Sequence, residues 1–298
     1  MPSTRAIRGR IKSVKNIAQV TRTMQMVASS KMRRAQERVQ QSRPYSEQLR
    51  ALVSRLARVT GEDVGGDIAL LKQRPVRGIG FVVIGPDRGL SGALPSNINR
   101  KAASTALDEQ RRFAEQGERP TVEYVVVGRK ARDFVIRNEL HMIAEFTNYG
   151  DKPSLGDATA IAQVATDAFL KGEVDVVYLI YAKFVNTVTQ QPTAVQLLPV
   201  QPPPEQEGES RNIEYIYEPD AASIYEALLP RYVDVQVYQA LLETVASFFS
   251  AQMVAMKNAT DNANDLVQDL TLTYNKARQA SITTQILEVV SGAEALSS

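Results

Sequence analysis

Few residues of this chain could carry out chemistry, and their types exclude most reactions. The 298 residues include no cysteine and a single histidine, His141. Without cysteine there are no disulfides, no thiolate metal ligands and no thiol nucleophiles. One histidine leaves little basis for metal binding or for histidine-based acid–base catalysis. We therefore interpret His141 as a structural residue and expect no catalytic residue, no metal site and no cofactor.

A glycine-rich stretch, GPDRGLSG (85–92), is the best candidate for a nucleotide site. It follows a predicted strand and precedes a helical region, which is where a phosphate-binding loop would lie. However, it matches neither GxGxxG nor GxxxxGK[ST], and no lysine follows its last glycine. We favour a tight strand-to-helix turn that needs glycine for a positive φ, and keep a nucleotide-binding enzyme as an alternative.

Positive charge is concentrated in the first segment of the chain. Residues 1–58 contain fourteen Lys and Arg against two acids, whereas residues 241–298 contain three basic and six acidic side chains. Phosphate contact needs such charge, but no aromatic residue precedes Tyr45 to stack on bases. We interpret the basic segment as a surface for an acidic protein partner rather than for nucleic acid. A solvated basic face without a partner is the other alternative.

Two long helices are predicted at the ends of the chain. Neither Gly nor Pro occurs from Arg10 to Arg43 or from Arg231 to Ser291, and the second stretch would be roughly 90 Å long as one helix. Pro44 marks a kink, after which the first helix resumes and runs to Gly61.

Both helices carry a coiled-coil seam, in which apolar residues alternate at spacings of three and four. Each seam can be buried only against another long helix, so we expect one antiparallel pair. The seam residues are Ile7, Ile11, Val14, Ala18, Thr21, Gln25, Ala28, Met32, Ala35 and Val39, and then Leu242, Ala246, Phe249, Met253, Met256, Thr260, Ala263, Val267, Leu270, Tyr274 and Ala277.

A second apolar line lies beside the seam on each helix. Such a pair should not stand in water, so other polypeptides should surround it. We expect residues near 10–30 to lie alongside residues near 265–290, so that both ends of the chain build one apolar tip. The residues of this line are Ile17, Val20, Met24 and Val27, and then Ile282, Ile286, Val289 and Val290.

The central part of the sequence predicts an α/β domain with a Rossmann-like open sheet. Its buried strands alternate with helical stretches, which favours parallel strands. VTQQPTAVQLLPV (188–200) is predicted as an added edge strand, because Pro192 suits only an edge. The other strands are predicted at 77–85, 121–128 and 175–184, and the helices around 95–116 and 156–171.

The predicted organisation is therefore a shaft of two terminal helices with an inserted domain. Two breaks, GEDVGGD (61–67) and PPPEQEGES (202–210), guide the boundaries. We assign residues 1–60 to the N-terminal shaft helix, 61–76 to a linker, 77–210 to the α/β domain and 211–298 to the C-terminal shaft helix with its lead-in.

No segment is predicted to cross a membrane. The longest apolar run, Val176 to Ala182, is far shorter than the ~18 residues that a span needs. The N-terminal MPSTRAIRGRIK has no apolar core behind its charges, so it does not resemble a secretory signal. We expect the cytoplasm or a cytoplasmic membrane face.

Six segments carry a resemblance to the γ subunit of F-type ATP synthase, and the resemblance extends over the whole chain. They are IRGRIKSVKNIAQVTRTMQMVASSKMRRAQ, GPDRGLSG, FVNTVTQ, YIYEPD, RYVDVQVYQALLE and MVAMKNATDNANDLVQDLTLTYNKARQASITTQILEVVSGAEAL.

The resemblance implies a non-catalytic rotor shaft, present in one copy per complex. In that family the paired helices sit inside a hexamer of three α and three β subunits, and the α/β domain and lower shaft bind the ε subunit and the membrane c-ring. Proton flow turns the c-ring and shaft together, and this rotation couples proton flow to ATP synthesis or hydrolysis on the hexamer. The γ subunit also regulates ATPase activity and proton flow. Membrane association is then indirect, on the cytoplasmic face of the bacterial cell membrane.

The resemblance also implies contact residues by motif position. The implied β-subunit contacts are Met24, Gln252, Arg278, Gln279 and Thr283. Gln252 stands where many relatives carry Arg, so a charged contact with the β subunit at this position is in question. The implied bearing in the hexamer consists of Ile286, Val289, Val290 and Leu296. The implied c-ring contacts at the foot are Tyr215, Tyr217 and Glu218.

The sequence departs from that family in two further ways. Pro86 and Ser91 stand where Ser and Cys are common, which we interpret as neutral. The cysteine-bearing regulatory insertion of chloroplast relatives is missing. We therefore do not expect thiol control of the chloroplast kind.

Overall fold

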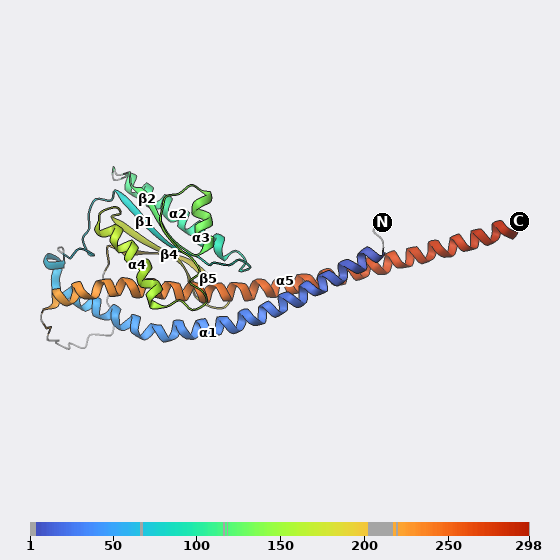
Figure 1. The fold of residues 1–298 in the computed structure, drawn as a ribbon, viewed down its shortest axis with the longest axis horizontal. Helices are drawn as coiled ribbons and strands as arrows, with labels where there is room; N and C mark the ends of the chain where they lie inside the picture. The colour runs from blue at the N-terminus through green and yellow to red at the C-terminus, as the bar shows by residue number, and fades with distance from the viewer. Residues whose placement is uncertain are drawn as a thin grey trace. The chain divides into compact units, whose positions relative to one another are not determined.

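The computed structural model describes residues 4–65, 68–115, 117, 119–201, 217–218 and 220–297, and for residues 60–65 and 294–297 the backbone alone. The chain forms two compact units. One consists of Met1–Ala28 with Gln252–Ser298, and the other of Ser29–Ala251. In chain order the elements are α1 (Thr4–Gly65), β1 (Gly78–Ile84), α2 (Leu94–Glu115), β2 (Thr121–Val127), α3 (Arg129–Arg137), β3 (Met142–Phe146), α4 (Leu155–Leu170), β4 (Val176–Phe184), β5 (Gln190–Leu198) and α5 (Ala221–Ser297) (Figure 1).

The unit Ser29–Ala251 is built on one five-stranded sheet with the order β3-β2-β1-β4-β5. β1 pairs in parallel with β2 and β4, and β2 pairs in parallel with β3. β5 lies antiparallel to β4 at the edge, with Pro192 opposite Ala182. The predicted open α/β sheet, its three buried strands and its edge strand are thus confirmed.

Two elements between residues 128 and 155 were missed by the prediction. α3 has nine residues, and β3 has five whose side chains are alternately half-buried and exposed. A short edge strand buries one face only, so it lacks the continuous apolar run that marks β1. Its signal in the sequence is correspondingly weak.

The core of this unit lies on both faces of the sheet. β1 alternates its side chains between two hydrophobic clusters, and every residue of the strand is buried. α4 covers one face, while α2 and α3 cover the other. The central segments of α1 and α5 also pack into both clusters, so they are part of this core. The predicted domain of 77–210 does not include these helix segments, and its boundaries stay a prediction.

Both terminal helices are longer than the sequence predicted. α1 continues through Pro44 to Gly65, five residues into the predicted linker 61–76. α5 begins at Ala221 and contains Pro230. A proline inside a helix costs about 3 kcal/mol locally, which is why the prediction placed the helix after it. The neighbouring Leu229 is completely buried, and such tertiary packing offsets the local cost.

Candidate functional site: the helix pair and the strand-end loops

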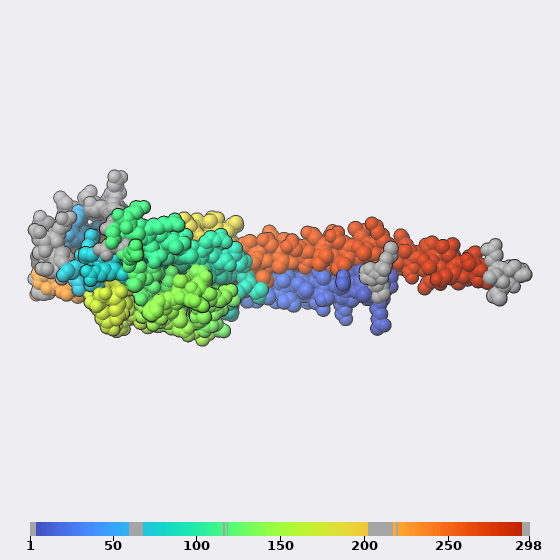
Figure 2. Space-filling view, turned by 90° about the horizontal axis from the view of Figure 1, so that it is seen from above, coloured from blue at the N-terminus to red at the C-terminus, as the bar shows by residue number. Residues whose placement is uncertain are grey.

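The predicted seam is the buried face of each long helix. Within the unit Met1–Ala28 with Gln252–Ser298, Ala28 is 1 % exposed, and Ile7, Met256 and Ala263 are also buried. All predicted seam residues in this unit are buried or half-buried. The two helix segments lie side by side in both views of the molecule (Figures 1 and 2). The coiled-coil prediction is therefore confirmed.

Two polar contacts define how these segments pair. Arg8 Nη2 donates to the Tyr274 hydroxyl at 2.5 Å, and its guanidinium lies 5.4 Å from the ring centroid. The hydroxyls of Thr21 and Thr260 are 2.7 Å apart. From Arg8 to Thr21 the residue number on α1 increases, while the number of the partner residue on α5 decreases from 274 to 260. The pair is antiparallel, as predicted.

This register corrects the predicted tip. Thr4, the first described residue of α1, lies at the level of about residue 278, so residues 10–28 do not face residues near 290 as expected. Figure 1 shows α5 continuing past the start of α1. Because a heptad seam fits several registers equally well, the sequence could not choose among them. The last part of α5, about five turns from Arg278 on, has no partner in the described part of α1.

The surface of the unit is apolar in two separate places. At the paired level Ile17, Val20 and Val27 of α1 are each more than half exposed. Beyond the pair, every described side chain from Arg278 to Ala293 is exposed, and Val289 is 71 % exposed. Water-exposed apolar side chains in this number are typical of a surface that a partner covers.

The N-terminal part of α1 is strongly basic. Between residues 4 and 28 the helix carries six Lys or Arg and no acid. Among the described side chains of 4–28 and 252–293, no ion pair joins the two helices. The complementary charges of the chain ends therefore do not hold the pair together by direct contact; the apolar seam does.

The residues implied as contacts fall into three groups in the structure. Met24 and Gln252 are half-buried beside the seam, whereas Arg278, Gln279 and Thr283 are exposed on the unpaired part of α5, together with Ile286, Val289 and Val290. Tyr217 is half-buried and packs on the core, and Glu218 is exposed. Tyr215 and the side chain of Leu296 lie outside the described residues. The contact roles themselves stay predictions.

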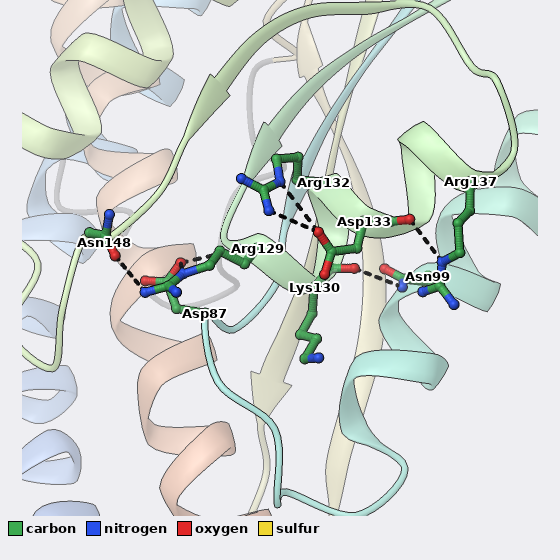
Figure 3. A network of polar contacts seen from close by, with 8 residues as sticks. All are labelled: Asp87, Asn99, Arg129, Lys130, Arg132, Asp133, Arg137 and Asn148. Atoms are coloured by element: carbon green, nitrogen blue, oxygen red, sulfur yellow. Dashed lines mark hydrogen bonds and ion pairs between the residues drawn. The ribbon is translucent and has the colours of Figure 1, made fainter.

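The glycine-rich loop 85–92 forms a structural turn. Gly92 has a φ of 58° and Leu90 a φ of 65°, the conformation that favours glycine. Asp87 Oδ1 accepts the backbone N–H of Arg129 at 3.1 Å at the start of α3. The Arg129 side chain lies 3.9 Å from the same oxygen and donates to Asn148 Oδ1 at 2.7 Å (Figure 3). The carboxylate of Asp87 thus occupies the donors that a phosphate would need.

α5 fills the crevice in which a doubly wound sheet would bind a ligand. That crevice lies at the carboxyl ends of β1 and β4, where the strand order reverses. β4 extends past Ile180, its last residue paired with β1, where it lies opposite Val83. The N–H of Ala182 then donates to Thr244 Oγ1 at 3.4 Å, and its carbonyl accepts from Ser247 Oγ at 3.0 Å. The N–H of Phe184 donates to Glu243 Oε2 at 3.3 Å.

Sequence reasoning missed these three polar residues of α5. Glu243, Thr244 and Ser247 are all buried, and they bind backbone groups of β4 beyond the stretch that β1 pairs. The signal was present, because polar residues interrupt the otherwise apolar stretch ALLETVASFFS at positions that share one helix face. They hold the helix to the sheet.

The remaining space near the loop is too small for a nucleotide. A cavity of about 30 Å³ lies among Pro86, Asp87, Tyr149, Val245 and Phe248, which is room for one water molecule. His141 pairs with Glu123 at the surface and is 74 % exposed. Within the described residues no cluster of His, Cys, Asp or Glu could hold a metal ion. The geometry thus favours the structural interpretation of the loop over the enzyme alternative.

Comparisons with known proteins agree with this arrangement. The family model described as ATP synthase matches residues 3–296. The chain is 50% identical to the ATP synthase gamma chain of Roseiflexus castenholzii over 99% of both chains, and 46% identical to that of Chloroflexus aurantiacus over all of both.

Solved structures share the fold. A chain of the Tetrahymena thermophila mitochondrial ATP synthase central stalk and c-ring has a TM-score of 0.58 and 24% identity over 80% of this chain and 99% of that one. A chain of the Euglena gracilis mitochondrial ATP synthase has a TM-score of 0.66 and 19% identity over 98% and 94% of the two chains.

Because the family model matches nearly the whole length, the chain belongs to the ATP synthase class of proteins. More particularly, the chain belongs to the ATP synthase gamma chain family. The family resemblance that the sequence implied is thereby confirmed. No described helix is both long enough and apolar enough to span a membrane.

Proposed function

We propose that this chain is the central shaft that couples proton flow through a membrane c-ring to ATP synthesis or hydrolysis on an α3β3 hexamer, without catalysing a reaction itself. The observation that carries the proposal is the sharp end of the seam at Ala277. Up to that residue the predicted seam side chains of α5 are buried or half-buried, and beyond it every described side chain is exposed. A single helix with an apolar surface is marginal in water, so a socket made by other chains must stabilise it.

The unpaired end of α5 and the basic face of α1 suit different parts of such a socket. The exposed apolar residues around Val289 fit an apolar sleeve, whereas the basic residues of α1, such as Arg22, fit acidic loops. The two faces of the pair differ in charge, since α5 carries Asp261, Asp265 and Asp269 where α1 is basic. Such contacts can favour a different conformation in each of three β subunits only if the shaft presents a different face to each of them. Contacts that are equally strong with every conformation would not shift the conformational equilibrium.

A non-catalytic role is supported by the crevice between β1 and β4. Glu243, Thr244 and Ser247 occupy it with hydrogen bonds to the sheet. A nucleotide would have to displace the helix α5, which packs into both clusters of the core. ATP chemistry then belongs to the partner subunits.

We further propose that the foot around Tyr217 and Glu218 contacts the c-ring and that the same unit binds the ε subunit. The chain would then lie peripherally on the cytoplasmic face of the bacterial cell membrane, in one copy per complex, and regulate ATPase activity and proton flow. Exposure of Glu218 is compatible with such a contact.

The test uses the chain in its complex. A native mass spectrum of the purified complex should show one copy per α3β3 hexamer, and the isolated chain should neither hydrolyse ATP nor bind a mononucleotide in calorimetry. Tight mononucleotide binding by the chain alone would overturn the proposal in favour of the enzyme alternative. DNA binding that persists after assembly would favour the nucleic-acid alternative.

A further inference from the structure

The loop between β3 and α4 joins several elements of the unit Ser29–Ala251. Three of its residues each bind a different part of the fold. Asn148 Oδ1 accepts from Arg129 of α3 at 2.7 Å, and the Tyr149 hydroxyl donates to the carbonyl of Gly85, where β1 ends, at 2.8 Å. The third residue, Asp151, reaches the long helices.

Asp151 binds α1 through both its side chain and its backbone. Lys31 Nζ lies 2.6 Å from Asp151 Oδ2, and Arg38 Nη1 donates to the backbone carbonyl of Asp151 at 2.9 Å. Its other carboxylate oxygen, Oδ1, pairs with Arg88 of the loop after β1. One carboxylate thus joins helix α1 to the strand-end loop of the sheet.

The same cluster includes α5. The ammonium group of Lys31 lies 5.4 Å from the centroid of the Phe249 ring, a cation–π distance. Phe249 is 2 % exposed and packs edge-on against Phe248 at 5.2 Å. Lys31 is therefore held between the carboxylate of Asp151 and an aromatic ring of α5.

The position of this cluster in the chain is informative. Lys31 is the third residue of the unit Ser29–Ala251, and Phe249 is the third from its end. Asp151 therefore binds α1 directly and reaches α5 through Lys31, near the ends of the helix segments that belong to this unit. The side chains of Lys31 and Asp151 are only 36 % and 30 % exposed, so solvent screens their attraction less than at a free surface.

We propose that Asp151 is a positioning residue that transmits torque, because it joins α1 directly, and α5 through Lys31, to the strand-end loop of the sheet unit. The inference rests on the proposed rotor function. A rotor needs a stiff joint between the part that is turned and the part that delivers the turn. The apolar core alone resists sliding of the helices less specifically than a charged clamp with fixed geometry.

The test compares Asp151→Asn with a matched control in the assembled complex. Asp151→Asn keeps the backbone carbonyl that Arg38 binds and removes the charge that holds Lys31 and Arg88. Asp133→Asn makes the same change in an ion pair with Arg132 within α3, at a side chain that is 39 % exposed and binds neither long helix. Since the chain has no cysteine, Ser104→Cys on α2 offers a single attachment point for a rotation probe.

Three results are expected with the hexamer immobilised and rotation stalled. The angular variance of the probe should rise about twofold in Asp151→Asn and stay unchanged in Asp133→Asn. Raising the salt concentration should increase the variance of the wild type but not of Asp151→Asn, because ions screen a charged clamp. Hydrogen exchange of residues 29–42 should accelerate about tenfold in Asp151→Asn alone, as expected when a local contact is lost.

A charge-swapped double variant provides the rescue. Asp151→Lys with Lys31→Glu restores one of the pairs, so it should recover part of the stiffness that Asp151→Lys loses. If Asp151→Asn assembles and rotates with unchanged variance and exchange, the inference is wrong while the rotor function stands. If the wild-type chain neither assembles nor rotates, the proposed function itself fails.

Discussion

Ser91 is a polar side chain placed in an apolar site. It is 1 % exposed, and its hydroxyl has no hydrogen-bond partner among the described residues. Its backbone carbonyl accepts from Leu94 at 3.3 Å and so helps to begin α2, a role that does not depend on the side chain. The interpretation of Ser91 as a neutral replacement for Cys therefore misses a cost, since burying an unpaired hydroxyl is unfavourable.

We expect Ser91→Ala to stabilise the chain by about 1 kcal/mol, because it removes the unpaired hydroxyl without leaving a large cavity. Urea denaturation of the purified chain measures the change in free energy of unfolding. The control is Ser104→Ala, an exposed position on α2 whose hydroxyl donates to the Lys101 carbonyl. Equal effects of the two substitutions would contradict the interpretation.

Glu243 of α5 is a carboxylate buried against the sheet. Burial raises its pKa above the ordinary value of 4.5, although hydrogen bonds from Gln239 and from the N–H of Phe184 and the charges of Lys183 and Arg43 oppose the shift. A carboxyl group with a raised pKa stabilises the fold fully below its unfolded pKa. That contribution is lost as the pH rises through the folded pKa.

Glu243→Gln carries no charge at any pH, so we expect its stability relative to the wild type to increase as the pH rises above 4.5 and then to level off. The measurement is the difference in free energy of unfolding between the two chains from acidic to neutral pH. Glu47→Gln, at an exposed position of α1, serves as the control. A difference between Glu243→Gln and wild type that stays constant with pH would show that the buried carboxylate does not titrate as described.

At the scale of elements, the junction of β2 with α3 requires glycine for two reasons. Gly128 has a φ of 89°, and a Cβ there would lie 2.0 Å from the Gly85 carbonyl oxygen. Gly117, between α2 and β2, has nearly the same φ, 87°, but open space around its Cβ position. Alanine at Gly117 would therefore test backbone strain alone, whereas alanine at Gly128 would add a steric clash.

We expect Gly117→Ala to cost about 1 kcal/mol, the price of a left-handed conformation for a residue with a side chain. Gly128→Ala should cost several kcal/mol, about 3 or more, since the strand-end loop must also move. Urea denaturation of the two variants checks the difference. Similar losses would mean that the loop at Gly85 yields easily, which would also weaken the case for a rigid joint there.

At the scale of the whole molecule, the exposed apolar surface of α5 matters only in assembly. Ile286 on α5 and Ile136 on α3 are 58 % and 56 % exposed, so lysine at either position should change the stability of the isolated chain little. A hexamer that encloses the end of α5 would bury the new charge at Ile286, which is costly without a partner.

We therefore expect Ile286→Lys to reduce assembly with the α3β3 hexamer at least tenfold, whereas Ile136→Lys should assemble normally. Co-purification with the hexamer measures assembly, and circular dichroism of each isolated chain confirms that it is folded. Normal assembly and coupling of Ile286→Lys would place the end of α5 outside the hexamer and contradict the proposed bearing.

The sequence by itself determined the seam, the sheet and the family. Every seam residue predicted from Ile7 to Val39 and from Leu242 to Ala277 is at least half-buried in the structure, because a helix of fixed period must bury the positions that recur on one face. The same local rules predicted β1, β2 and β4, whose continuous apolar runs are typical of strands covered on both faces.

Only the tertiary structure decided the register of the helix pair, the helical turn around Pro230, the closure of the β1–β4 crevice by α5 and the cluster around Asp151. Each depends on contacts between residues far apart in the chain, such as Thr21 with Thr260 or Lys31 with Asp151. A periodic seam is satisfied equally by pairings one heptad apart, and a carboxylate in a loop carries no sign of which helix it will meet. Such choices are made by packing, which local sequence patterns do not encode.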